Sequence, residues 1–158
     1  MSLYQRRLPH WQPTGPPLFL TWRLHGTLPA NRYFGREGLS SGRVFVCLDR
    51  YLDRAGHGPA WLRQDDIAQL VVDSLHFGQQ RLGYYQLHAW VVMANHVHLL
   101  LTPLVPASRL QQSLKGFTAR AANKILGRIG EPFWQRESYD HWVRSESEFQ
   151  HIVSYIEN

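Results

Sequence analysis

The sequence has 158 residues, of which 44% are hydrophobic and 18% are charged, as expected of a globular protein rather than a disordered one. The net charge is +5, and all of the basic residues except Lys115 and Lys124 are arginines. Arginine binds phosphate through two parallel hydrogen bonds and stacks on bases, so this balance favours a polyanionic partner. A general arginine bias of the genome would produce the same counts. The single cysteine, Cys47, excludes an internal disulfide and a cysteine-based zinc site.

The sequence contains no segment that indicates a membrane or secretory destination. The first residues, MSLYQRRLPHWQP, have no apolar run after their charges, and no stretch reaches the ~18 apolar residues of a membrane helix. We therefore expect a cytoplasmic protein with no membrane partner. The length predicts a single domain, residues 1–158.

The first half of the chain predicts an arm, a strand and two helices. Residues 1–17 contain four prolines and are expected to form an extended arm. LFLTWRL, residues 18–24, has the composition of a strand, and residues 25–42 that of a long loop. Residues 43–56 are ambiguous between strand and helix, and we favour a short helix. Asp65 or Asp66 then caps a helix that carries apolar residues at steps of three and four and ends near Gly83.

The second half predicts a hairpin, a helix, a short strand and a last helix. Residues 84–94 and 96–102 form the two hairpin strands, with Asn95 in the turn. A helix from about Ala107 to Gly127 or Gly130 follows, and SYDHWVR, residues 138–144, is a short strand. SESE fits a capping box with Ser145 as the cap. The apolar side of the helix from Ala107 consists of Leu110, Leu114, Phe117, Ala121 and Ile125. That of the last helix consists of Phe149, Ile152, Val153 and Ile156.

This order predicts an α+β fold of the ferredoxin-like kind, in which a βαββαβ unit makes an antiparallel sheet with helices on one face. The last helix is an addition to that unit.

Two histidines open the second hairpin strand, in the stretch NHVHLLL. Side chains alternate along a strand, so His96 and His98 share a face, roughly 6–7 Å apart, while Val97 and Leu99 point to the other face. Two imidazoles that converge in this way can bind one divalent ion and leave positions open for a phosphate oxygen.

The alternative for this pair is a solvated strand face, because an H-x-H pattern is short. The apolar hairpin favours binding, since an unpartnered imidazole would be costly there. No H-E-x-x-H motif or carboxylate cluster accompanies the pair, so a third strong ligand of the kind used by zinc hydrolases is not indicated.

Several segments together resemble one family. VVMANHVHLLL is similar to the histidine–hydrophobic–histidine motif of the HUH single-strand nucleases, and most of all to REP-associated tyrosine transposases, members of the single-tyrosine, IS200-like transposases. The resemblance continues, in the expected order, through LPHWQP, KGFTAR, FWQRESYDHWVR and IVSYIEN, and so covers nearly the whole chain.

The resemblance implies a set of functional residues. His96 and His98 match the metal-binding pair, with Mg²⁺ or Mn²⁺ as the ion. Tyr155 matches the nucleophile, which attacks a DNA phosphate to give a 5′-phosphotyrosine and a free 3′-hydroxyl. The substrate implied is single-stranded DNA with a hairpin of the repetitive extragenic palindrome kind. Tyr155 taken alone would be an ordinary helix-edge tyrosine, and Tyr139, with His141 as an extra ligand, is a competing nucleophile.

Two positions depart from the pattern of the resembled family. Ala94 stands where its members usually have proline. The third metal ligand there is commonly an amide side chain four residues after the tyrosine, whereas three residues follow Tyr155 in this sequence. No third ligand is therefore predicted, and Asn158 is not given that role.

Basic and aromatic side chains are expected to contact the DNA backbone and bases. For the basic residues of the helix from Ala107, the alternative is a solvent-exposed helix face with no role in DNA binding. The candidates are Arg6, Arg7, Trp11, Lys115, Arg120, Lys124 and Arg136.

These observations predict a metal-dependent, single-tyrosine DNA endonuclease and strand transferase. A non-catalytic nucleic-acid-binding regulator descended from a transposase and a metal phosphoesterase that uses water are the alternatives. Both a monomer and a homodimer are compatible with the sequence.

Overall fold

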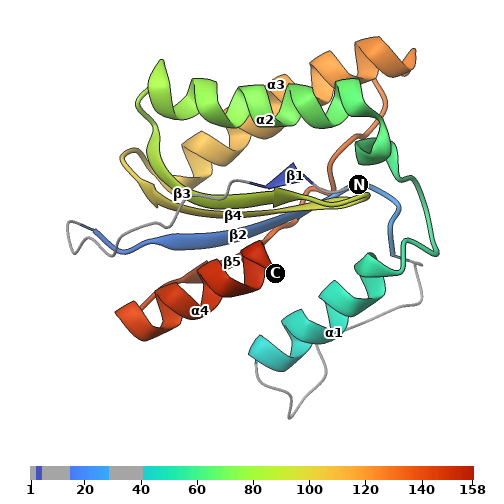
Figure 1. Ribbon diagram of the computed structural model, residues 1–158. Helices are drawn as coiled ribbons and strands as arrows, with labels where there is room; N and C mark the ends of the chain where they lie inside the picture. The colour runs from blue at the N-terminus through green and yellow to red at the C-terminus, as the bar shows by residue number, and fades with distance from the viewer. Residues whose placement is uncertain (1–2, 5–14, 29–40) are drawn as a thin grey trace.

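The computed structural model describes residues 3–4, 15–28 and 41–158 (Figure 1). The elements in chain order are β1 (Leu3–Tyr4), β2 (Leu18–Arg23), α1 (Ser41–Asp53), the short 3-10 helix η1 (Trp61–Arg63), α2 (Asp65–Gln80), β3 (Tyr85–Val92), β4 (His96–Pro103), α3 (Ala107–Leu126), β5 (Tyr139–Trp142) and α4 (Glu146–Glu157).

All pairs of neighbouring strands are antiparallel, and the sheet has the order β1-β3-β4-β2-β5. Without the two-residue edge strand β1, the chain runs β2-α2-β3-β4-α3-β5 through a sheet ordered β3-β4-β2-β5. This is the ferredoxin-like arrangement, and the predicted fold class is confirmed.

Helices cover both faces of the sheet. Figure 1 shows α2 and α3 on one face and α1 and α4 on the other. The larger apolar core lies under α2 and α3, and a smaller one lies under α1 and α4. The helices of the βαββαβ unit are on one face as predicted, while α1, inserted between β2 and α2, joins the C-terminal helix on the opposite face.

Strand β4 shows how the sequence alternation divides these two cores. Val97, Leu99 and Leu101 belong to the core under α2 and α3, whereas Leu100 belongs to the core under α1 and α4. His96 and His98 alternate with the first set, so they lie on the face that α1 and α4 cover. Both histidines are buried.

The structure differs from the prediction in the N-terminal arm and at the start of α2, and it confirms the predicted cap of α4. Of the predicted arm, Leu3 and Tyr4 pair with Val92 and Val91 of β3 and so form an edge strand. Helix α2 begins at Asp65, and its N-cap is Gln64 rather than an aspartate. Ser145 caps α4 as predicted, by accepting a hydrogen bond from the backbone N–H of Glu148 at 3.1 Å.

The predicted apolar side of α3 was wrong in part. Leu110 and Leu114 are buried, but Phe117 and Ile125 are 52% and 49% exposed. The buried side continues instead through Thr118 and Ala122. These residues follow Leu114 at steps of four, so they lie on the same side of the helix. Thr118 satisfies its hydroxyl by donating to the Leu114 carbonyl at 2.7 Å.

Candidate metal and tyrosine site

Helix α1 supplies a carboxylate that the sequence analysis did not predict. Phe45, Asp49 and Leu52 are buried, while Val46 and Arg50 are exposed, so one side of the helix packs on the sheet. Phe45 is the apolar anchor of this side and contacts the ring of Phe19 on β2, with the centroids 5.5 Å apart. One turn further along α1, this packing places the Asp49 carboxylate against β4.

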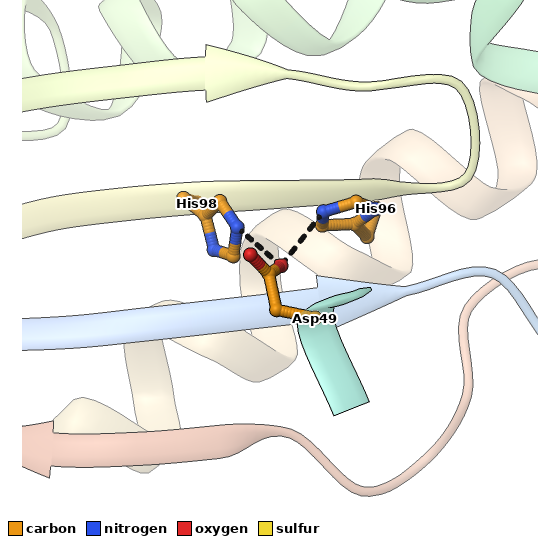
Figure 2. Close-up of side chains that lie close together, drawn as sticks. All are labelled: Asp49, His96 and His98. Atoms are coloured by element: carbon orange, nitrogen blue, oxygen red, sulfur yellow. Dashed lines mark hydrogen bonds and ion pairs between the residues drawn. The ribbon is translucent and has the colours of Figure 1, made fainter. Parts of the chain in front are cut away.

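Asp49 lies between the two histidines (Figure 2). Its Oδ1 is 2.9 Å from Nε2 of His98 and 3.1 Å from Nε2 of His96. The three side chains are buried, and each can direct one ligand atom to a common point, since the three atoms lie within 4.8 Å of one another. The side chains of His96 and His98 thus share a face and converge, as the alternation predicted.

Neighbouring side chains orient both imidazoles. Nδ1 of His96 is 2.8 Å from Oδ1 of Asn95, and Nδ1 of His98 is 2.8 Å from the hydroxyl of Thr21. An amide oxygen only accepts, so His96 donates from Nδ1, and its neutral form turns the lone pair of Nε2 towards Asp49. The Thr21 hydroxyl can donate or accept, so it suits either tautomer of His98.

The Nε2 atom of His96 is therefore an unsatisfied group. It is buried and has no hydrogen-bond partner among the residues that the structure describes, although the Asp49 oxygen is 3.1 Å away. Two lone pairs at that distance repel each other unless a proton or a metal ion lies between them. This arrangement fits a metal ion.

The spacing of the three ligand atoms also fits a divalent ion. Adjacent ligands of an octahedral magnesium ion, each about 2.1 Å from the metal, are roughly 3.0 Å apart. The two distances from Asp49 to the histidines, 2.9 and 3.1 Å, match that edge. Three protein ligands leave positions open for substrate oxygens, as catalytic sites require.

The electrostatics of the site keep Asp49 and His98 in their metal-binding forms. Burial by itself raises the pKa of Asp49, but the imidazoles of His96 and His98 outweigh it and hold that pKa below its ordinary value. Burial lowers the pKa of His98 despite the adjacent carboxylate. An ionised aspartate and a neutral imidazole are the forms that bind metals.

Asp53 follows Asp49 by one helical turn and lies at the edge of the site. Its Oδ1 is 3.6 Å from Nε2 of His96, and its side chain is 47% exposed. Burial, and then the charge of Asp49, raises the pKa of Asp53. Asp53 therefore adds negative charge beside the three buried ligands without belonging to them.

Tyr155 on α4 lies beside the histidine pair. Phe149, Ile152, Val153 and Ile156 are buried as predicted and hold α4 on the sheet. Tyr155 flanks this apolar side, is 40% exposed, and has its ring centroid 5.7 Å from that of His98. A cavity of about 580 Å³ is lined by Asp49, Asp53, His98 and Tyr155 among others. The structure thus brings Tyr155 to the same cavity as Asp49 and His98.

The other candidates of β5 lie near Tyr155 but apart from the metal ligands. Tyr139 and His141 share a face of β5, as predicted, and line a neighbouring cavity. His141 pairs through Nε2 with the carboxylate of Glu148, so Glu148 does not reach back to the cap as the capping box predicted. His141 is not one of the three converging ligands.

Most predicted DNA contacts of the second half lie on the far side of the sheet. Arg120 and Lys124 are exposed on α3, in the layer opposite the histidines. The ammonium of Lys115 donates to the backbone carbonyl of Gln135 at 2.8 Å, and burial lowers the pKa of Lys115. The side chain of Arg136 is exposed, and the backbone carbonyl of Arg136 accepts a hydrogen bond from the Lys115 ammonium. Arg6, Arg7 and Trp11 lie outside the described residues.

The sequence held one signal for Asp49. In CLDRYLD, Asp49 and Asp53 are four residues apart, and Asp49 falls on the same side of the helix as Phe45 and Leu52. An acidic residue within an apolar helix side is unusual, because a buried carboxylate needs a partner. Residues 43–56 were ambiguous between strand and helix, and this pattern is visible only if the segment is taken as a helix.

A comparison with known families identifies the family of the chain. Residues 64–158 match the family described as Transposase IS200 like. Because the match spans more than half of the chain, the protein is a transposase by class, and the chain belongs to the IS200-like transposase family. No helix within the described ranges has the length and apolar character needed to cross a bilayer.

The solved structures that are similar to this chain include two transposases. One is a REP-associated tyrosine transposase bound to a REP hairpin, with 18% identity and a TM-score of 0.47 over 96% of this chain and 68% of that chain. The other, assigned as a transposase of Deinococcus radiodurans R1, has 22% identity and a TM-score of 0.49 over 90% of this chain and 88% of that chain. No curated protein matches the sequence.

Proposed function

We propose that this protein is a metal-dependent DNA strand transferase that cleaves single-stranded DNA next to a hairpin through a covalent bond to Tyr155. The observation that carries this proposal is the position of Tyr155, whose ring lies 5.7 Å from His98 in the cavity that also contains Asp49. Membership of the IS200-like transposase family supports DNA as the substrate.

Asp49, His96 and His98 would hold the ion, which we propose to be Mg²⁺ or Mn²⁺. When bound, this ion polarises the scissile phosphate and neutralises the charge that builds on its oxygens. The mixed nitrogen and oxygen ligand set, with open positions for phosphate oxygens, suits such an ion. Thr21 and Asn95 fix the two rings, so the ligands need no rearrangement before the substrate arrives.

Tyr155 would act as the nucleophile. Its phenolic oxygen forms a bond to phosphorus, the bond from phosphorus to the 3′-oxygen breaks, the phenol proton is released to solvent, and the 3′-oxygen is protonated. The products are a 5′-phosphotyrosine and a free 3′-hydroxyl. The covalent link conserves the phosphodiester energy, which a later transfer to another 3′-hydroxyl uses. Partial exposure of Tyr155 leaves room for the DNA strand.

A labelled hairpin oligonucleotide, incubated with the protein and Mn²⁺ and separated on a denaturing gel, tests this proposal. Wild-type protein should give a band of covalent protein–DNA adduct. Tyr155→Phe should lose the adduct completely, whereas Tyr139→Phe should retain it, because Tyr139 does not line the cavity of the metal ligands. An adduct that persists in Tyr155→Phe and disappears in Tyr139→Phe would transfer the role to Tyr139.

A second candidate function is supported by Asp49. The local sequence motifs indicated no third strong ligand for a metal hydrolase, and Asp49 supplies one. A metal phosphoesterase would cleave the same oligonucleotide by water, without an adduct and independently of Tyr155. Band shifts in a native gel without any cleavage would instead indicate a non-catalytic DNA-binding regulator.

A further inference from the structure

Tyr155 separates two cavities on the face that α1 and α4 cover. The first contains Asp49, Asp53 and His98. The second has a volume of about 350 Å³ and lies between α1, β5 and α4, and Tyr155 is the one lining residue in the described chain that the two cavities share. Whatever occupies the second cavity is therefore next to the group that Tyr155 attacks.

The walls of the second cavity are largely aromatic. The ring of Phe45 lies 4.6 Å from that of Tyr139, at 31°, and 5.9 Å from that of Tyr155. Phe19 lies behind Phe45 and closes the wall towards the sheet. Val46, which also lines the cavity, is 40% exposed, so the cavity opens to solvent along α1. Phe19 and Phe45 are buried, so the partly exposed rings of Tyr139 and Tyr155 are the ones that a planar base can contact.

One edge of this cavity is polar. The His141 imidazole and the Glu148 carboxylate form a pair whose side chains are 34% and 30% exposed. A carboxylate has about four acceptor sites, so a bond from His141 leaves capacity for a donor from a ligand. Glu148, Ile152 and Tyr155 recur at steps of four and three along α4, which places this carboxylate on the same side of the helix as the tyrosine.

Helix α1 links the two cavities. Phe45 and Asp49 are one turn apart on the same side, so a single turn of α1 supplies both a wall residue of the second cavity and a proposed metal ligand. A substrate that bridges both cavities would carry a phosphate at one end and a flat apolar group with amino donors at the other. A nucleotide has this form.

We propose that the second cavity binds the base of the nucleotide adjacent to the phosphate that Tyr155 attacks, and that it prefers a base with an exocyclic amino group. The half-buried Tyr139 provides stacking, with Phe45 packed behind it, and Glu148 accepts a hydrogen bond from the amino group, as carboxylates do from cytosine. This inference rests on the proposed function for the position of the phosphate. It goes beyond that function by assigning a base-binding site and its chemical preference.

The first test measures binding without cleavage. Single-stranded oligonucleotides that carry one 2-aminopurine, moved stepwise along the strand, are titrated with protein in the presence of Ca²⁺ in place of Mn²⁺. Quenching of the fluorescence at one position is expected, because 2-aminopurine loses emission when it stacks. Val46→Trp, which fills the open side of the cavity, should abolish that quenching.

Ile125→Trp is the matched control. Ile125 is also an exposed β-branched helix residue, at 49%, but it lies on α3 in the opposite layer. This variant should quench like the wild type. Equal quenching in Val46→Trp and in wild type, or quenching at no position, would overturn the base-binding site whether or not the protein cleaves DNA.

The second test measures cleavage under single-turnover conditions with Mn²⁺. Removing the base beside the scissile phosphate should slow the wild type by about tenfold, since stacking of one base on aromatic side chains contributes on that order. Val46→Trp should slow cleavage of the intact strand by a similar factor. Removal of the base should not slow cleavage by this variant any further. Glu148→Gln should reduce the preference for cytosine over thymine at that position.

The two tests separate this inference from the proposed function. Position-specific quenching without any covalent adduct would retain the base-binding site and reject the strand transferase. Adduct formation with no effect of base removal would retain the transferase and reject the base-binding site.

Discussion

The Asp49 carboxylate on α1 lies 2.9 Å from Nε2 of His98 on β4, and both side chains are buried. These residues are 49 positions apart in the chain. Helix α1 therefore does more than cover the sheet, because it completes a set of three ligands that β4 alone begins.

Asp49→Asn should weaken Mn²⁺ binding by on the order of 100-fold or more, because changes to residues that merely support a ligand already cost 10–100-fold. Paramagnetic resonance of free Mn²⁺ during a titration measures this affinity directly. Asp53→Asn is the control, since Asp53 is on the same helix but is 47% exposed and lies 3.6 Å from His96. It should change the affinity by only a few fold. Equal losses in the two variants would argue against Asp49 as a distinct ligand.

Thr21→Val should weaken metal binding by about 10–100-fold, because Thr21 holds the His98 ring through Nδ1 at 2.8 Å. Thr102→Val is matched to it, since the Thr102 hydroxyl contacts Nε2 of the buried His88 at 2.7 Å, outside the ligand set. Each variant should lose about 1–3 kcal/mol of stability, the cost of leaving a buried polar group unpaired. Only Thr21→Val should reduce the rise in melting temperature that Mn²⁺ produces. A similar reduction in Thr102→Val would contradict a local role for Thr21.

His88 should make the protein less stable in weak acid. Burial lowers the pKa of His88 to about 4, whereas a histidine in the unfolded chain titrates near 6.5. As the pH falls below about 6.5, the unfolded chain binds the proton first, so the free energy of unfolding decreases until the pH reaches about 4. Between pH 7 and pH 5 this contribution is about 2 kcal/mol.

Urea unfolding at these two pH values, on wild type and His88→Gln, measures that contribution. Glutamine keeps a polar side chain near Thr102 but does not titrate. The loss of stability from pH 7 to pH 5 should be about 2 kcal/mol smaller in the variant. Both proteins retain His96 and His98, so the difference isolates His88. An identical pH dependence would show that His88 is not held neutral.

Gly78→Ala should destabilise the protein by about 1–3 kcal/mol through overpacking. A Cβ atom at this position in α2 would lie 2.4 Å from the Tyr85 hydroxyl and 2.9 Å from its ring, and Tyr85 is fully buried and donates to the Leu75 carbonyl. Thermal unfolding followed by circular dichroism measures the effect.

Gly116→Ala on α3 should stabilise the protein, in contrast to Gly78→Ala on α2. Its nearest neighbour would be the mobile end of the Arg120 side chain at 3.2 Å, which can move aside. Alanine should then stabilise α3 by about 0.5–1 kcal/mol, because glycine is the poorer helix former. Destabilisation of similar size in both variants would mean that helix α3 is packed more tightly at this point than its exposure indicates.

The local patterns of the sequence determined most of the elements and half of the site. The hairpin of β3 and β4, the helix ending at Gly127, and the Ser145 cap each depend on residues a few positions apart, and the structure has all three. The shared face of His96 and His98 follows from the two-residue period of a strand, which is a property of the backbone alone.

Packing between distant segments decided the rest. Asp49 became a ligand because Phe45 and Leu52 seat α1 on the sheet, and no local pattern states where a helix will dock. Phe117 and Ile125 looked like core residues yet are exposed, because α2 and the sheet cover only one side of α3. Secondary structure reflects contacts within a few residues, whereas a site that converges from α1, β4 and α4 exists only after the long-range apolar contacts have formed.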